Sequence, residues 1–200
     1  MRIVSIVTGH GEVESVPILI RRIAHQIDPT INLKIIRPPI RIPESRLRKN
    51  SEIKRAIELA TLKLGGRGGI FILLDCDWKN CCPAKEGPTL LRKAGSSRQD
   101  IYISVVLAKK EFESWFIAAA KSLRGQRSLS SSLIPDPDPE SIRGAKEWLS
   151  RHMTDRTYSE TTDQPALTEK FDLQQARNAD SFDKCYREIQ NMIKQLSIAQ

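Results

Sequence analysis

The stretch IFILLDCD, residues 70–77, joins five consecutive apolar residues to two aspartates that are two positions apart. An unbroken apolar run of this length is typical of a strand that is covered on both faces in a parallel sheet. Side chains two positions apart on an extended segment face the same way, so Asp75 and Asp77 can address one ion or two neighbouring ions. The stretch therefore predicts a buried strand over 70–74 that leads into a pair of carboxylates.

Further strands and helices alternate on both sides of this strand. Apolar runs predict strands over 3–7, 33–36 and 101–107, the second of them closed by Arg37-Pro38-Pro39. Helices are predicted over 12–27, from residue 50 or 51 to 64, around 87–94 and over 111–123. The alternation predicts an α/β fold of Rossmann-like type, with a mostly parallel four-stranded sheet flanked by helices.

The chain divides by composition into three parts. Residues 1–123 are predicted to form the α/β core that carries the metal site. Residues 124–140 (RGQRSLSSSLIPDPDPE) are rich in Ser, Pro and Asp, which indicates a linker. Helices predicted over 141–153 and 181–196 make residues 141–200 a helical C-terminal extension packed on the core.

Composition is ordinary for a soluble globular protein, since 40% of the 200 residues are apolar and no run approaches membrane-spanning length. The amino terminus enters a strand pattern at once and does not resemble a signal peptide. We therefore expect a cytoplasmic protein with no membrane partner. Three of the four cysteines lie within seven residues, and Cys81 adjoins Cys82, a poor disulfide framework, so free thiols are expected.

The net charge of +8 is concentrated in one segment. Residues 21–67 hold twelve Lys and Arg against four Asp and Glu, an excess of eight. Such a segment suits a polyanion such as DNA or RNA, and a solvated face without a partner is equally compatible with it. The candidate nucleic-acid-binding residues are Arg21, Arg22, Arg41, Arg46, Arg48, Lys49, Lys54 and Arg55.

Acidic residues follow three of the four predicted strands. Ligands of open parallel sheets bind outside the carboxyl ends of the strands. The acids are Glu12 and Glu14 after the first strand, Asp75 and Asp77 after the third, and Glu111 and Glu113 after the fourth. Like charges so close together favour a bound cation, and Mg²⁺ prefers oxygen ligands. Glu111 and Glu113 cannot point the same way on a helix, and Glu113 is preferred as the inward one.

The loop Gly9-His10-Gly11 admits a second interpretation, because it begins like a dinucleotide-binding fingerprint. Glu14 occupies the third glycine position, and two glutamates at the helix start would repel a pyrophosphate. No cofactor other than a metal is therefore expected. His10 is either a proton shuttle beside Glu12 or a loop residue bonded to backbone, and the second is the commoner case.

Three segments resemble, in order, the signatures of the Toprim-like family catalogued as domain of unknown function 4276: GHGEVESVPILIRRI, LLDCDWKNCCPAKEGPTLL and VVLAKKEFESWFIAAAKSL. A later stretch, GAKEWL…YSETTDQPALTEKFDLQQAR…SF, resembles the carboxyl-terminal part of that family. The family is related to overcoming-lysogenization-defect and RloB-like nucleases. The resemblance implies a Toprim fold in which Glu12, Asp75 and Asp77 bind divalent metal and the EFESWF segment contributes Glu113.

The resemblance implies a Mg²⁺- or Mn²⁺-dependent nuclease with catalytic Glu12, Asp75, Asp77 and Glu113. The residue pattern keeps Glu111 in reserve as a further metal ligand. The resemblance also implies a defence role against phages or mobile elements, beside an ATPase partner. The sequence does not decide whether the chain forms a homodimer. Many relatives have a glutamate where this chain has Thr8. An inactive module that binds nucleic acid or the ATPase is therefore the alternative, and a primase-like nucleotidyl transferase is a third.

Overall fold

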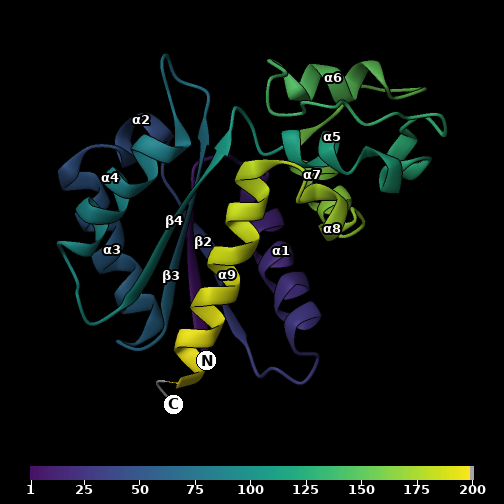
Figure 1. Ribbon diagram of the computed structural model, residues 1–200. Helices are drawn as coiled ribbons and strands as arrows, with labels where there is room; N and C mark the ends of the chain where they lie inside the picture. Colours follow the sequence, from purple (N-terminus) through teal and green to yellow (C-terminus); the bar gives the residue numbers. More distant parts are fainter. Residues whose placement is uncertain (199–200) are drawn as a thin grey trace.

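Four parallel strands form one sheet in the order β2-β1-β3-β4 in the computed structural model, which describes residues 1–198 (Figure 1). The strands are β1 (Arg2–Val7), β2 (Lys34–Arg41), β3 (Gly69–Cys76) and β4 (Tyr102–Lys109). Each neighbouring pair is parallel, as the alternation of strands and helices predicts. The sheet is therefore open, with β2 and β4 at its edges.

The central strand β3 is covered on both faces. Phe71 and Leu73 belong to one apolar cluster, and Ile70, Ile72 and Leu74 belong to the other, and all five are at most 1% exposed. Two buried faces explain why the strand is an unbroken apolar run rather than an alternating one. The carboxyl end of β3 therefore emerges between two covered faces.

Helices cover the two faces in pairs (Figure 1). One face carries α1 (Glu12–Ile27) and α9 (Asp180–Ile198), and the other carries α3 (Asn50–Leu64) and α4 (Pro83–Gly95), with the short α2 (Glu44–Leu47) beside α3. In α1 the residues Val16, Leu19, Ile20 and Ile23 are fully buried, as helical spacing requires. The positions predicted for α1 and α3 are confirmed.

The second strand and the helix after the fourth strand differ from the sequence prediction. The prediction that Arg37-Pro38-Pro39 closes the second strand is wrong, because β2 continues through both prolines to Arg41. An edge strand tolerates proline where the missing N–H would face solvent. The helix predicted over 111–123 is shorter, with α5 at Ser114–Ala118 followed by the 3₁₀ turn η1 at Ala120–Leu123.

Residues 124–198 pack against the sheet and α1. Segment 124–140 contains the 3₁₀ turn η2 (Gln126–Ser128) and buries Leu129 and Leu133. It is followed by α6 (Ala145–Arg151), α7 (Glu160–Thr168) and α8 (Leu173–Ala176), and then by α9. Helix α7 lies against α1, and α9 lies beside β4. In residues 1–198 no helix is long and apolar enough to cross a bilayer.

The expectation of four free thiols is wrong for two of them. Cys76 ends β3, the chain turns back over residues 77–80, and Cys76 and Cys81 form a disulfide with their Cα atoms 5.6 Å apart. That separation is typical of disulfides. The sequence argument weighed the adjacent pair Cys81 and Cys82, whereas the turn pairs Cys81 with a residue five positions earlier. Cys82 and Cys185 are free.

Candidate functional site: an acidic cluster at the carboxyl edge of the sheet

Three carboxylates from three strand ends meet at one edge of the sheet. Glu12 begins α1 after β1, Asp75 is the penultimate residue of β3, and Glu113 precedes α5 after β4. Because β1, β3 and β4 are parallel neighbours, their carboxyl ends lie side by side. Glu12 is 1% exposed and Glu113 is fully buried, while Asp75 is partly buried. These three residues are called the acidic cluster below.

Burial and mutual repulsion both raise the pKa values within the acidic cluster. Burial, assisted by the nearby charges of Glu113 and Glu160, raises the pKa of Glu12 to about 7 against the opposing effect of two backbone hydrogen bonds. The pKa of Asp75 is raised well above its usual value, first by burial and then by the charges of Glu12 and Glu113. Burial also raises the pKa of Glu113. The cluster therefore favours a proton or a cation among its carboxylates.

Glu12 is held by the loop that precedes its own helix. Its Oε2 atom accepts hydrogen bonds from the backbone N–H groups of Thr8 at 2.8 Å and Gly9 at 2.9 Å. Because one oxygen is tied to the backbone in this way, the carboxylate has a fixed position at the end of β1. Asp75 is fixed similarly, since its Oδ1 accepts the N–H of Phe112 at 2.9 Å.

Glu113 has one satisfied oxygen and one unsatisfied oxygen. Its Oε1 accepts hydrogen bonds from the Tyr158 hydroxyl at 2.8 Å and from Gln164 Nε2 at 3.0 Å. Within residues 1–198, the buried Glu113 Oε2 and Gln164 Oε1 have no hydrogen-bond partner. A buried acceptor without a donor costs about 1–3 kcal/mol. Two such oxygens beside buried carboxylates fit an oxygen-binding cation.

Lys146 provides a positive charge at the cluster. It lies on α6, and its Nζ atom is 3.3 Å from Glu160 Oε2. Its charge lowers the pKa values of Asp75 and Glu113, and they in turn help to raise its own pKa. Five carboxylates act on this part of the molecule, namely Glu12, Asp75, Glu111, Glu113 and Glu160. One ammonium cannot neutralise five ionised carboxylates, so Lys146 reduces the charge imbalance without removing it.

The glycine loop allows α7 to approach the cluster. Gly11 donates its backbone N–H to Glu160 Oε1 at 3.0 Å. A Cβ atom on Gly11 would lie 2.6 Å from both Gln164 Oε1 and the Glu160 carbonyl oxygen. The absence of a side chain at residue 11 therefore lets α7 reach the acidic cluster, and this explains the loop without a dinucleotide.

Gly11→Ala is expected to destabilise the protein by about 1–3 kcal/mol, the usual cost of overpacking a filled site. Its Cβ would meet the backbone of α7, which cannot rotate away. Urea unfolding checks this, with Gly95→Ala as the matched control. A Cβ on Gly95 meets nothing within 4 Å, so that variant should equal or exceed the wild type in stability. Equal stability of the two variants would contradict the close packing of α7.

The other predicted site residues lie farther out. Asp77 is exposed beyond the end of β3, and Glu111 is partly buried with its Oε2 accepting the Lys146 N–H at 3.4 Å. Glu14 is exposed and forms an ion pair with Arg37, and His10 is exposed. In the described part of the chain, no three His, Cys, Asp or Glu side chains form a ready-made metal site. The five-residue ligand set of Glu12, Asp75, Asp77, Glu111 and Glu113 therefore stays a prediction.

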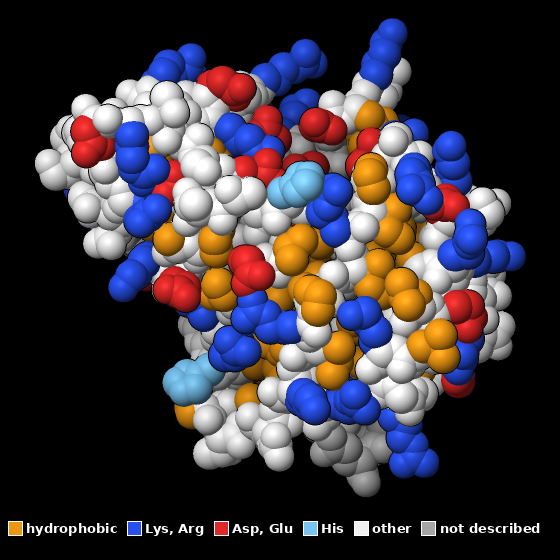
Figure 2. Space-filling model, turned by 180° about the vertical axis from the view of Figure 1, so that it is seen from behind, with side chains coloured by type: hydrophobic (Ala, Val, Ile, Leu, Met, Phe, Trp, Pro, Cys, Tyr) orange, Lys and Arg blue, Asp and Glu red, His pale blue; other side chains and the backbone are white. Residues whose placement is uncertain are grey.

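The predicted nucleic-acid-binding residues fall into two groups. Arg41 ends β2 and reaches the Thr8 carbonyl at 3.4 Å, and Arg46, Arg48, Lys49, Lys54 and Arg55 follow on α2, α3 and the turn between them. This group lies near the same edge of the sheet as the acidic cluster, because it follows the carboxyl end of β2. Figure 2 shows Lys and Arg side chains around acidic side chains on one face of the molecule. Arg21 and Arg22 lie roughly 14 Å farther along α1, and Arg22 bonds the Thr168 carbonyl.

Several basic side chains at this edge already have partners. Arg46 and Arg55 pair with Glu52, and Arg48 pairs with Glu44 while it stacks on Trp78. Lys49 and Lys54 are exposed, and no ion pair holds either of them within residues 1–198. These two lysines are therefore the most available charges beside the cluster.

Sequence reasoning missed four residues of the site. Lys146, Tyr158, Glu160 and Gln164 all come from the region after residue 140, which was assigned only to a helical extension. The signal for these residues is the family resemblance of the stretches GAKEWL and YSETTDQPALTEKFD, to which the sequence alone assigns no role. Its Asp163 is fully buried between Arg127 and Arg156 and accepts the Ser159 N–H, so it fixes the start of α7.

The fold and the site define a parallel α/β protein with a buried acidic cluster at the carboxyl edge of its sheet. The family described as "Domain of unknown function (DUF4276)" matches residues 7–190, and the chain belongs to this family. The match includes every residue of the acidic cluster as well as Lys146 and Gln164. No curated protein and no solved structure matches the chain significantly.

Proposed function

We propose that this chain is a Mg²⁺-dependent nuclease of Toprim type that hydrolyses phosphodiester bonds of DNA or RNA. The convergence of Glu12, Asp75 and Glu113 at one sheet edge carries the proposal, together with the unsatisfied Glu113 Oε2. Mg²⁺ typically uses one or two protein carboxylates and keeps several waters, so it does not need a closed protein cage. The Toprim assignment, the defence role and the ATPase partner rest on the sequence resemblance.

The residues have distinct roles in this proposal. Asp75 and Glu12 would hold the metal, and exposed Asp77 would be a further ligand. Glu113 completes the site from the β4 side, where Tyr158 and Gln164 orient it. Bound Mg²⁺ would lower the pKa of a water molecule and neutralise charge on the leaving oxygen. Arg41, Lys49 and Lys54 would hold the nucleic-acid backbone beside the site.

The direct test is incubation of the purified chain with end-labelled single- and double-stranded DNA and RNA. Cleavage is expected with Mg²⁺ or Mn²⁺ and should cease with EDTA. Cleavage that continues at the same rate in EDTA would reject a metal nuclease. Calorimetric titration with Mn²⁺ in parallel shows whether a protein that does not cleave still binds metal. It therefore distinguishes the absence of a metal site from a metal site without catalytic activity.

A second candidate is an inactive module that binds nucleic acid or an ATPase. Thr8 favours it, because many relatives have a glutamate at that position. Thr8 is mostly buried and donates its backbone N–H to Glu12. Because its side chain is a hydroxyl, it contributes no carboxylate to the site. This candidate predicts Mn²⁺ binding without turnover on any of the four substrates.

Salt dependence should identify the backbone-binding lysines. The double variant Lys49→Gln, Lys54→Gln is expected to reduce the slope of log affinity against log salt by about 2, or about 1 per lost phosphate contact. Fluorescence anisotropy with a labelled oligonucleotide measures this slope. The salt concentration should run from about 50 to 200 mM, a range over which phosphate contacts change the affinity strongly. Lys194→Gln on α9 is the control and should leave the slope unchanged. An unchanged slope in the double variant would remove these lysines from the interface.

A further inference from the structure

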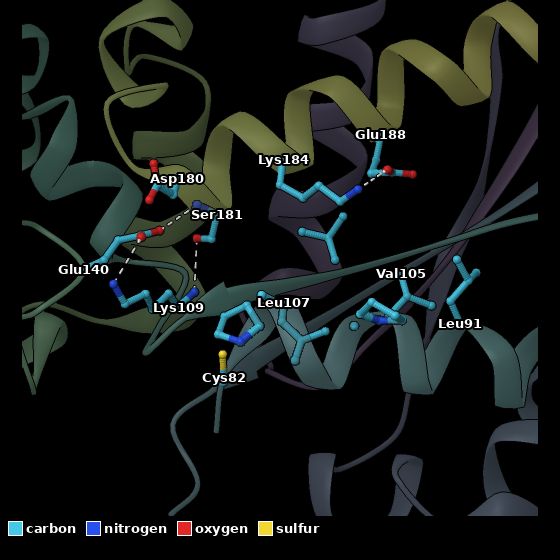
Figure 3. A pocket seen from close by; sticks show the side chains of 15 residues that line it. Cys82, Leu91, Val105, Leu107, Lys109, Glu140, Asp180, Ser181, Lys184 and Glu188 are labelled. Carbon is cyan, nitrogen blue, oxygen red and sulfur yellow. Dashed lines mark hydrogen bonds and ion pairs between the residues drawn. The ribbon is translucent and has the colours of Figure 1, made fainter. Parts of the chain in front are cut away.

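A groove of about 580 Å³ runs along β4 between α4 and α9 and includes no residue of the acidic cluster (Figure 3). One wall comes from α4, with Ala84, Pro88 and Leu91, and the other comes from the first turns of α9. Strand β4 forms the floor, through Val105 to Leu107 and Lys109. The lining is largely apolar, and its charged residues lie on the α9 side and at the end near Glu140.

The floor of the groove is an open sheet edge. The backbone N–H of Lys109 donates to Ser181 Oγ at 3.1 Å, so it points away from β3. Backbone directions alternate along a strand, and β3 pairs with β4 without irregularity from Tyr102 to Lys109. The N–H and C=O groups of Val105 and Leu107 therefore point into the groove. No side chain of residues 1–198 bonds these groups.

The other sheet edge is protected against pairing, whereas β4 is not. Strand β2 contains Pro38 and Pro39 and exposes Lys34, Arg37 and Arg41 along its length. Proline and charged residues are the usual devices that prevent a strand from joining an edge. Strand β4 (YISVVLAK) has no proline, and its one charged residue is at its end. Its backbone is thus available to one more strand.

The position of β4 selects a single extended chain as the occupant. Residues of α4 and α9 form the two walls of the groove and β4 forms its floor, so the groove has the shape of a channel for one extended chain. The groove contains Lys109 and Lys184 against Glu140, Asp180 and Glu188, a net charge of −1 on a chain of +8. This charge disfavours nucleic acid as the occupant.

Ion pairs leave one carboxylate available to a partner. Lys184 pairs with Glu188 at 2.5 Å, and Lys109 lies 3.9 Å from Glu140. Asp180 is exposed and has no ion pair within residues 1–198. A basic side chain on the occupant would therefore complement Asp180, while its apolar side chains pack against Leu91 and Pro88.

We propose that the groove between α4 and α9 binds an extended segment of a partner protein, which pairs with β4 as a fifth strand. The segment has apolar residues at alternate positions and a lysine or arginine beside Asp180. Addition of a strand to an open edge takes its affinity from main-chain hydrogen bonds and its specificity from the side-chain pockets. The acidic cluster takes no part in this interaction.

The test uses a fluorescein-labelled peptide, KVTVTVTK, in anisotropy titrations with the full chain. Two further versions carry N-methyl groups, one on every valine and the other on every threonine. In an extended peptide, the backbone N–H groups of either the valines or the threonines point toward β4, but not both. The version that is methylated on the set facing β4 loses up to three hydrogen bonds of about 1 kcal/mol each, so it should bind about a hundredfold more weakly. The other should bind as the parent peptide does. Equal affinity of all three versions would overturn the proposal.

Protein variants locate the site. Gly87→Leu places a side chain in the groove, because a Cβ on Gly87 would lie 3.8 Å from Leu107 Cδ1, and it should abolish peptide binding. Gly95→Leu, on the same helix in open space, should retain binding. Asp180→Asn should weaken binding of KVTVTVTK and leave a QVTVTVTQ peptide unaffected. Equal effects of the two glycine variants would place the peptide elsewhere.

Hydrogen exchange distinguishes the other occupants. The parent peptide should slow exchange of the Val105 and Leu107 amides in the full chain. Protection that grows with protein concentration in the absence of peptide would show a second copy of the chain on β4. Protection by an oligonucleotide instead would show a nucleic acid there. Either result would contradict the proposal.

Discussion

Asp75→Asn is expected to reduce metal-dependent cleavage about a thousandfold, because the metal contributes several kcal/mol to the transition state and 1.36 kcal/mol is a factor of ten. Asp75 is the carboxylate on which the charges of Glu12 and Glu113 both act. Asparagine keeps the Oδ1 atom that accepts the Phe112 N–H, so the β3 end should stay in place. The loss would therefore report on the charge and not on the fold.

A matched variant separates this effect from that of removing an acidic side chain elsewhere on the protein. Asp100→Asn removes an exposed aspartate just before β4, at the opposite end of the strands, where Asp100 pairs with Arg98. It should leave the cleavage rate unchanged within about twofold, as surface substitutions usually do. Single-turnover rates of the three proteins, compared at saturating Mg²⁺, decide the matter. Equal rates for Asp75→Asn and wild type would remove Asp75 from the reaction.

Stability of the metal-free protein is expected to fall as the pH rises from about 5 to 8. The folded state raises the pKa of Glu12 from 4.5 to about 7, so between these values the folded chain holds a proton that the unfolded chain has lost. The stabilisation is complete below pH 4.5 and is lost as the pH rises through 7. This difference corresponds to about 3 kcal/mol for Glu12. Asp75 and Glu113 have raised pKa values too and act in the same direction.

Urea unfolding in EDTA at four pH values across this window measures the effect. Glu12→Gln removes the titrating group, so its stability should vary less with pH than that of the wild type. Asp163 and Asp183 have lowered pKa values and act in the opposite direction, but only below about pH 4, outside the window. Wild-type stability that rises between pH 5 and 8 would contradict the buried, repelling carboxylates.

Metal should reverse this trend. A ligand that binds only the folded chain stabilises it by about 2.7 kcal/mol when its concentration is a hundred times its dissociation constant. Mn²⁺ binds ionised carboxylates, so the gain should be larger at pH 8 than at pH 5. A gain that is independent of pH would place the metal away from Glu12 and Asp75.

The sheet and the carboxylates could be predicted because their signals are local. Five apolar residues before Asp75 indicate a doubly covered strand, and the spacing of Val16, Ile20 and Ile23 indicates the helix that begins at Glu12. Parallel strands then place their carboxyl ends at one edge without further information. The preference for Glu113 over Glu111 agrees with the structure, which buries Glu113 fully, but the helical argument behind it does not apply, because both residues precede α5.

The rest of the site depends on contacts between distant residues. Lys146 and Glu160 reach the cluster through the packing of α6 and α7, and nothing in the local pattern around either residue specifies that approach. Helix α7 itself contains Pro165 and is weakly patterned, so the sequence predicts no helix between the helices at 141–153 and 181–196. The Cys76–Cys81 pair likewise depends on a turn whose direction the residues 77–80 do not reveal.

Anomalous scattering from a crystal soaked in Mn²⁺ tests the central claim most directly. We predict at least one manganese peak bonded to Asp75, with Glu12, Asp77 or Glu113 as a further ligand, at the carboxyl edge between β1 and β3. Glu113 Oε2 should then have the partner that it lacks in the metal-free chain. Saturating manganese that binds only elsewhere, with the acidic cluster still occupied by protons alone, would contradict the metal-dependent nuclease.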